Sequence, residues 1–162
     1  MTVTKVDKDT SANTMTITAE FDAPVERVWR IWEDPRLLEK WWGPPTYPAT
    51  FVEHELVAGG KSSYSMTGPQ GDTSGGWWRI TSVDPPHGLE FEDGFADKDG
   101  LPNASVPTIT NRVTLTERPE GGTRMTVELS FESAAAMAKI MSMGMEEGMT
   151  AAMGQIDALV AR

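Results

Sequence analysis

The stretch SAAAMAKIMSMGMEEGMTAAMGQIDALVA (133–161) decides the fold, because it contains no proline and is rich in Ala, Met and Glu. Residues of this kind favour helix, so we expect a single helix of about 40 Å at roughly 1.5 Å per residue. The segments that precede it have instead the two-residue period of strands. One long helix is therefore expected to cover one sheet.

Apolar and polar residues alternate from Met15 to Phe21, which predicts the first strand. Two short helices are expected next, at 25–33 and 35–42, since Pro24 suits a first helical turn and Gly43 ends the second. Later strands follow one another with only turn sequences between them, which implies an antiparallel meander and an α+β fold. These strands are expected at 47–57, 61–67, 76–83, 88–95, 108–117 and 123–131.

Composition limits the classes of function. The 24 acidic and 14 basic side chains give a charge of −10, which disfavours nucleic acid or anionic lipid as a partner. The absence of cysteine excludes a disulfide scaffold, a thiol nucleophile and thiolate metal sites. No signal peptide or membrane span is recognisable, so we expect a cytoplasmic protein. Its 162 residues suit one domain at 13–162, after a polar and flexible N-terminus at 1–12.

Methionine is spaced by four along one side of the predicted C-terminal helix. Such a stripe is typical of core packing, but methionine is also flexible and polarizable and lines adaptable apolar sites. Both interpretations stay open. Gly144, Gly148 and Gly154 lower helix propensity, so we expect them to allow close backbone approach or to leave room for a ligand. The stripe consists of Met137, Met141, Met145, Met149 and Met153.

Few residues suggest catalysis. His54 is a weak candidate for a general base, because alternation places it on the inward face of its strand with Val52 and Leu56. Glu53 and Glu55 then point away from it, and a structural histidine is the alternative. The chain has no HExxH, GxSxG, P-loop or Rossmann motif. We therefore assign no catalytic residue and expect neither a metal site nor a cofactor.

Aromatic residues give the better indication of a site. Adjacent Trp77 and Trp78 must point to opposite faces of their strand, and we expect Trp78 to lie inside with Ile80. The exposed partner of each Trp pair would leave an apolar patch suited to a dimer, so both a monomer and a homodimer are considered. A wall of Tyr, Trp and Met is typical of small-molecule sites, with core packing as the alternative. The expected cavity residues are Trp41, His54, Tyr64, Met66, Trp78, Ile80, Phe91, Met141, Met145 and Met149.

The stretch from Asp84 to Asn103 concentrates negative charge. It carries six acids, among them Asp93 and Asp99, and one lysine. We expect a solvated loop, because the segment DGFADKDG (93–100) lacks the spacing and closing Glu of a calcium-binding loop.

Four stretches taken together resemble a known family. They are FDAPVERVWRIWEDPRLLEKWWGP (21–44), ELVAGGKSSYSM (55–66), GGWWRITSVDPPHGLEF (75–91) and GMEEGM (144–149). The family is the activator of Hsp90 ATPase homologue 1-like (AHSA1-like) branch of the START / Bet v 1-like (SRPBCC) superfamily, and the resemblance spans about residues 13–161. It implies a helix-grip fold, in which a curved antiparallel sheet wraps around a long C-terminal helix and two short helices after the first strand close one end.

The resemblance implies several functions, because the family is functionally divided. We expect binding of a hydrophobic or aromatic small molecule in the cavity between the sheet and the C-terminal helix, without covalent chemistry. An alternative is an interaction protein of the Hsp90-activator type, with a chaperone as partner and a role in stress response. Further alternatives are a polyketide cyclase-like enzyme and an enediyne-type antibiotic resistance protein.

Overall fold

The computed structural model describes residues 3–97, 101–103 and 105–161 of the chain. The described residues form an eight-stranded sheet in the order β1-β2-β8-β7-β6-β5-β4-β3, in which every neighbouring pair is antiparallel. This confirms the expected antiparallel architecture. The strands are β1 (Val3–Asp9), β2 (Thr14–Phe21), β3 (Ala49–His54), β4 (Lys61–Thr67), β5 (Thr73–Asp84), β6 (Gly88–Ala96), β7 (Ile109–Glu117) and β8 (Thr123–Phe131).

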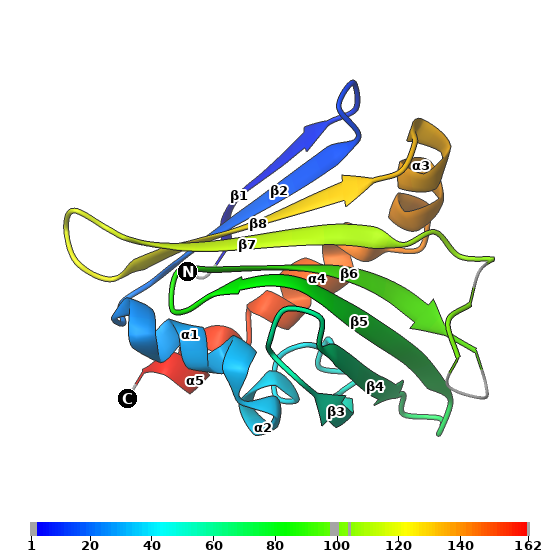
Figure 1. Ribbon diagram of the computed structural model, residues 1–162, viewed down its shortest axis with the longest axis horizontal. Helices are drawn as coiled ribbons and strands as arrows, with labels where there is room; N and C mark the ends of the chain where they lie inside the picture. The colour runs from blue at the N-terminus through cyan, green and yellow to red at the C-terminus, as the bar shows by residue number, and fades with distance from the viewer. Residues whose placement is uncertain (1–2, 98–100, 104, 162) are drawn as a thin grey trace.

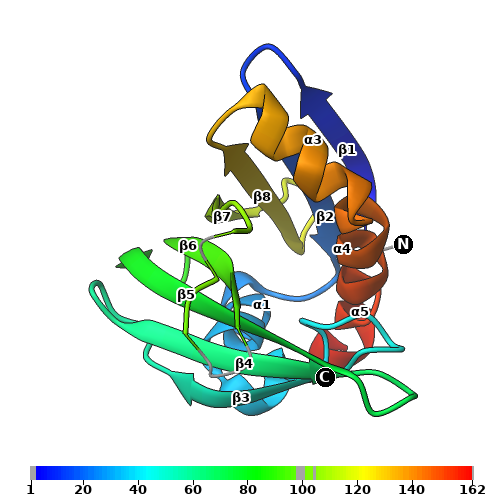
Figure 2. The same cartoon turned by 90° about the vertical axis from the view of Figure 1, so that its right-hand side faces the viewer.

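The helices lie along the inner side of this sheet, which curls around them (Figures 1 and 2). Two short helices follow β2, and three helical segments close the chain, which confirms the helix-grip arrangement of an α+β protein. None of the helices in the described part of the chain is long and apolar enough to cross a membrane. The helices are α1 (Val25–Glu33), α2 (Pro35–Leu38), α3 (Ala134–Ser142), α4 (Met145–Met153) and α5 (Ile156–Val160).

The C-terminal segment is not the single helix that its composition predicts. Gly144 has φ +83°, a left-handed conformation that only glycine adopts without strain, and it separates α3 from α4. A second break at Gly154 and Gln155 separates α4 from α5. The breaks let three short helices follow the curved sheet, as Figure 2 shows, where one straight helix would diverge from it.

The first residues are also more ordered than their polarity predicts. Residues 3–9 form β1, which pairs with β2 along its length, so the expected flexible terminus at 1–12 is wrong for these residues. Val3 and Val6 are half-buried and pack against the core, while the residues between them are exposed. An edge strand with so few buried positions carries a weak periodic signal, which explains why its sequence reads as unstructured.

A bulge in β3 reverses the alternation expected there. The register with β4 shifts between Phe51 and Glu53, so Phe51 points inward at 3% exposure and Val52 points outward at 83%. Side chains of the α2 region hold this irregular edge: Arg36 donates to the Phe51 carbonyl at 3.0 Å, and Glu39 accepts from the Phe51 N–H at 2.7 Å. The expectation that Val52 faces inward is therefore wrong.

A cluster of large rings forms the centre of the core. Trp78 stacks on Phe91 with ring centroids 4.1 Å apart, and Trp42 contacts Trp78 edge-on at 4.8 Å. Trp32 likewise meets Trp41 at 4.8 Å. Trp29, Trp32, Trp41, Trp42 and Trp78 are all buried, so the apolar dimer patch expected from the Trp pairs is not formed by these five side chains.

The two adjacent tryptophans of β5 supply a matched test of this core. Trp78 is buried as expected, whereas Trp77 lies half-buried on the other face of the strand. Trp78→Ala should lower the free energy of unfolding by about 3–5 kcal/mol, because it opens a cavity in the ring cluster. Urea denaturation followed by circular dichroism measures the loss. Trp77→Ala is the control and should cost less than half as much; equal losses would contradict the assigned faces.

Candidate functional site

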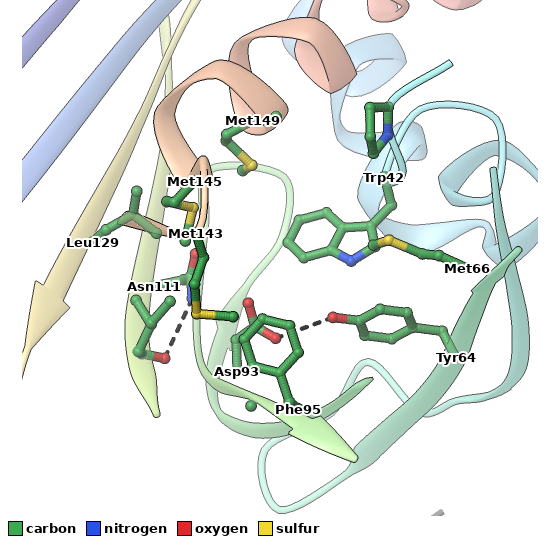
Figure 3. Close-up of a pocket in the computed structure, with 14 residues that line it drawn as sticks. Trp42, Tyr64, Met66, Asp93, Phe95, Asn111, Leu129, Met143, Met145 and Met149 are labelled. Carbon is green, nitrogen blue, oxygen red and sulfur yellow. Dashed lines mark hydrogen bonds between the residues drawn. The ribbon is translucent and has the colours of Figure 1, made fainter. Parts of the chain in front are cut away.

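A cavity of about 240 Å³ lies between the sheet and the junction of α3 with α4 (Figure 3). For comparison, an engineered apolar cavity of about 150 Å³ holds benzene. Most of the wall is apolar, and four polar groups interrupt it on the side formed by the strands and Trp42. The lining residues are Trp42, Pro44, Tyr64, Met66, Asp93, Gly94, Phe95, Ile109, Asn111, Leu129, Met143, Met145, Gly148 and Met149.

Tyr64 reaches the cavity from β4 because its partner in β5 is a glycine. Tyr64 pairs with Gly76, and a Cβ at Gly76 would collide with the Tyr64 ring. The ring therefore lies flat across β5, with Phe51 stacked on it at 4.9 Å. This position brings the Tyr64 hydroxyl to Asp93, to which it donates a hydrogen bond of 3.2 Å (Figure 3).

Asp93 is an acidic residue on the inward face of β6. The alternation of that strand places it with Leu89, Phe91 and Phe95, all of which point to the interior. Burial raises the pKa of Asp93 from 3.8 to about 7, and the Tyr64 hydroxyl offsets only part of that increase. Burial, and then the charge of Asp93, also raise the pKa of Tyr64 well above 10, so Tyr64 stays protonated as a donor.

Two further polar atoms at the cavity have no hydrogen-bond partner in the described part of the chain. Asn111 is fully buried in β7; its amide nitrogen donates weakly to the Ile109 carbonyl at 3.4 Å, but its Oδ1 accepts nothing. The indole Nε1 of Trp42 has no partner in strict hydrogen-bond geometry, although this N–H acts on the Tyr64 hydroxyl and offsets part of the rise in the pKa of Tyr64 that burial causes. Buried polar groups are normally satisfied, so Asn111 Oδ1 is the lining atom that most needs an outside donor.

The helical side of the cavity holds Trp42 in place. Gln155, at the start of α5, donates to the Gly43 carbonyl at 2.7 Å and so ties the last helix to the turn that carries Trp42. The apolar wall on this side is formed by the flexible side chains of Met145 and Met149 from α4 and of Met143, which lies between α3 and α4.

The arrangement can bind hydrogen-bonding groups and can exchange a proton near neutral pH through Asp93. No group of three or more His, Asp or Glu side chains within the described ranges is placed to hold a metal ion. The polar groups that a bound molecule could contact in this apolar cavity are the Asp93 carboxyl, the Tyr64 phenol, the Asn111 amide and the Trp42 N–H.

The cavity brings together four of the ten residues expected to line it: Tyr64, Met66, Met145 and Met149. The other expectations are corrected. Met141 is half-buried on α3 and lies outside the lining. Trp41, Trp78, Ile80 and Phe91 are buried in the core and do not border the space. Part of the aromatic wall is thus core packing, as the alternative interpretation held.

His54 also lies away from the cavity. Its Nδ1 is 2.7 Å from the Ser62 hydroxyl and its Nε2 is 2.8 Å from the Trp32 carbonyl, so both ring nitrogens are engaged. Burial lowers the pKa of His54. His54 is therefore the structural histidine that the sequence analysis gave as the alternative to a general base. A cyclase-type reaction in this cavity could not use His54 as its base, because His54 does not line the cavity.

Sequence reasoning missed Asp93 and Asn111, the two most informative residues of the site. The strand expected at 88–95 is confirmed as β6 (Gly88–Ala96), so Asp93 belongs to this strand and not to the solvated loop expected over 84–103; Asp99 lies outside the described residues. A signal was present: Asp93 interrupts the apolar row Leu89, Phe91 and Phe95, and Asn111 interrupts the equivalent row of β7. A polar residue at an inward position of a strand is a candidate site residue.

Stability should depend on pH through Asp93. Below about pH 4 its carboxyl is protonated in both states; between about pH 4 and 7 only the unfolded chain loses the proton, so the free energy of unfolding falls as pH rises. Asp93→Asn removes this penalty. Relative to wild type, the variant should therefore gain about 2–3 kcal/mol between pH 5 and pH 8, measured by urea denaturation at each pH.

Glu92→Gln is the control for that comparison, because Glu92 precedes Asp93 in β6, points to the opposite face and pairs there with Arg79. A difference between Asp93→Asn and wild type that stays constant over this pH range would show that Asp93 is not desolvated.

Comparisons with known proteins agree with the fold. The family model described as "Activator of Hsp90 ATPase homolog 1-like protein" matches residues 22–161. Protein Ms6760 from Mycobacterium smegmatis is 52% identical over 98% of this chain and 96% of that chain, with a TM-score of 0.90. A protein from Arthrobacter aurescens is 54% identical over 99% of this chain and 92% of that chain, with a TM-score of 0.94.

A more distant structure, the AHSA1 protein from Silicibacter pomeroyi, is 21% identical over 91% of this chain and 97% of that chain, with a TM-score of 0.74, and shares the fold. A search of curated proteins finds no match.

Proposed function

Since this chain belongs to the activator of Hsp90 ATPase homolog 1-like family, whose name fixes neither a ligand nor a reaction, we propose its function from its cavity. The protein binds an apolar or aromatic small molecule between the sheet and the C-terminal helical segment. The observation that carries this proposal is a mostly apolar cavity whose wall holds the Tyr64–Asp93 pair and the unpartnered Asn111 Oδ1.

The shape and lining of the cavity suit this role. Small-molecule sites are concave and mostly apolar, with a few polar groups that fix the orientation of the ligand. Here Trp42, Phe95 and the methionines of the α3–α4 junction supply the apolar surface. Apolar contact contributes roughly 25 cal/mol per Å² buried before ordering costs, so a ligand that fills the chamber gains most of its affinity there.

Gly148 supports the same proposal from the helical side. It lies within α4 and lines the cavity, and a Cβ built on it meets no atom within 4 Å. Glycine inside a helix costs about 1 kcal/mol relative to alanine, and no backbone contact requires it at this position. The missing side chain at Gly148 leaves open space at the wall of the cavity, and a ligand can occupy that space.

The first experiment is a native mass spectrum of the purified protein with a mixed panel of sterols, fatty acids, flavonoids, polyketides and small aromatic amines. A one-to-one adduct would support the proposal and name a chemical class. A spectrum without adducts across the panel would contradict it and would make the Hsp90-activator alternative the next to test, through the turnover of the host's Hsp90 homologue.

Filling the cavity should abolish binding without unfolding the protein. Gly148→Met places a side chain in the open space and also raises helix propensity, so the thermal midpoint should stay the same or rise. Titration calorimetry with a panel ligand should show at least about a tenfold loss of affinity, since each 1.4 kcal/mol lost is tenfold.

Ala151→Met is the matched control, because Ala151 is an exposed residue of the same helix. Equal affinity in Gly148→Met and Ala151→Met would place the ligand elsewhere.

A further inference from the structure

Two side chains at one end of the cavity, Asp93 and Asn111, present acceptor oxygens that the protein does not fully use. Asp93 offers two carboxyl oxygens, of which Oδ1 accepts from Tyr64, and Asn111 offers an Oδ1 that accepts nothing. The Tyr64 hydrogen is already used on Asp93, so the donors left among the described lining side chains are the second amide N–H of Asn111 and the N–H of Trp42, which acts on the Tyr64 hydroxyl. A ligand that engages both Asp93 and Asn111 Oδ1 must bring more than one donor.

No cation among the described residues neutralises Asp93 at the cavity. The described lining residues include no Lys, Arg or His, and the groups that act on the Asp93 carboxyl are its buried surroundings and Tyr64. Buried carboxylates are usually paired with a positive charge, because an isolated one is costly to desolvate. A positively charged group on the ligand can supply the ion-pair partner that Asp93 lacks among the described lining residues.

The rest of the chamber also suits a positive group. The ring face of an aromatic residue attracts a cation within about 6 Å, and Trp42, Tyr64 and Phe95 border the same space. Methionine sulfur is polarizable and tolerates charged neighbours better than a branched aliphatic side chain does. The net charge of −10 adds a long-range attraction for cations.

We propose that the ligand is a hydrophobic amine, bound as its ammonium ion, whose N–H groups donate to the Asp93 carboxylate and to Asn111 Oδ1. Its apolar body lies against the methionines of the α3–α4 junction. This inference rests on the proposed function, and it adds the chemical class of the ligand. Figure 3 shows the geometry it uses: Asp93 and Asn111 border the same chamber, with Met145 and Met149 on the helical side.

Other ligand classes fit less well. An anion would be repelled by the negative charge of Asp93, and the described lining residues include no Lys, Arg or His to pair with it. An alcohol carries one donor, so it can satisfy only one of the two acceptor side chains, which costs affinity relative to an amine. Selectivity for an amine over these two classes is therefore the measurable property.

The test uses three matched probes: phenethylamine, 2-phenylethanol and 3-phenylpropionate, titrated calorimetrically into the full chain at about pH 8. We expect phenethylamine to bind about tenfold more tightly than 2-phenylethanol, because a charge-assisted hydrogen bond is roughly twice as strong as a neutral one and the amine brings more donors. We expect 3-phenylpropionate to bind most weakly.

Asp93→Asn is nearly isosteric; it removes the charge and replaces one acceptor oxygen by an amide NH2, so it should reduce the preference for the amine over the alcohol to within about threefold. Glu92→Gln removes an equivalent charge from the outer face of β6 and should keep the preference. Circular dichroism of both variants establishes that they are folded.

Titration at lower pH gives a second readout that a structural role of Asp93 would not produce. Tyr64 stays protonated, and Asn111 and Trp42 do not ionise, so Asp93 is the titrating group among the described lining residues. The preference for phenethylamine over 2-phenylethanol should fall about tenfold between pH 8 and pH 5.5 as Asp93 takes up its proton.

The outcomes separate this inference from the proposed function. If 2-phenylethanol binds as tightly as phenethylamine, or if Asp93→Asn keeps the preference, the amine inference is wrong and binding in the cavity stands. If 3-phenylpropionate binds most tightly, the inference is also wrong. If none of the three binds and Gly148→Met changes no ligand interaction found with the panel, both proposals fail.

Discussion

The contact of Trp42 with Trp78 is the interaction on which the rest of the structure depends. Their rings meet edge-on at 4.8 Å and join the turn after α2 to the inner face of β5. Trp78 in turn stacks on Phe91, so the short helices are fixed to the middle of the sheet through three large rings. Aromatic pairs contribute about 0.5–1.5 kcal/mol beyond their burial, and they tolerate only a few relative orientations. This cluster therefore sets where the helical layer stands above the sheet.

The cavity exists because the ring cluster holds the helical layer at a distance from part of the sheet. Trp42 occupies one side of it and the methionines of the α3–α4 junction occupy the other, because the left-handed Gly144 turns the chain at that height. Filled cores leave few voids larger than a water molecule, so a chamber of about 240 Å³ is a built feature. Asp93 and Asn111 then supply an acceptor-rich end, at a cost in folding stability that a structural role alone does not explain.

The regular elements were largely predictable, because strands with one buried face carry a period of two that is visible residue by residue. The prediction was wrong where a backbone irregularity intervened. The bulge after Phe51 inverted the faces of Phe51 and Val52, and the glycine at 144 divided the expected long helix. His54 points inward as expected, but it meets Ser62 and the Trp32 carbonyl and does not line the cavity. A bulge depends on the partner strand and on side chains from elsewhere, here Arg36, which no local pattern reveals.

The sequence by itself determined the antiparallel meander of β3–β8, the helical C-terminus and the inward position of residues such as Tyr64 and Trp78, because alternation, turn residues and helix propensity are local properties. Only the tertiary structure decided which inward residues pack against one another and which border an empty space. Trp78 and Tyr64 share the same kind of position in neighbouring strands, yet one is core and the other lines the cavity. The physical reason is that a cavity is bounded by several distant elements at once, and its existence depends on how far apart their packing holds them.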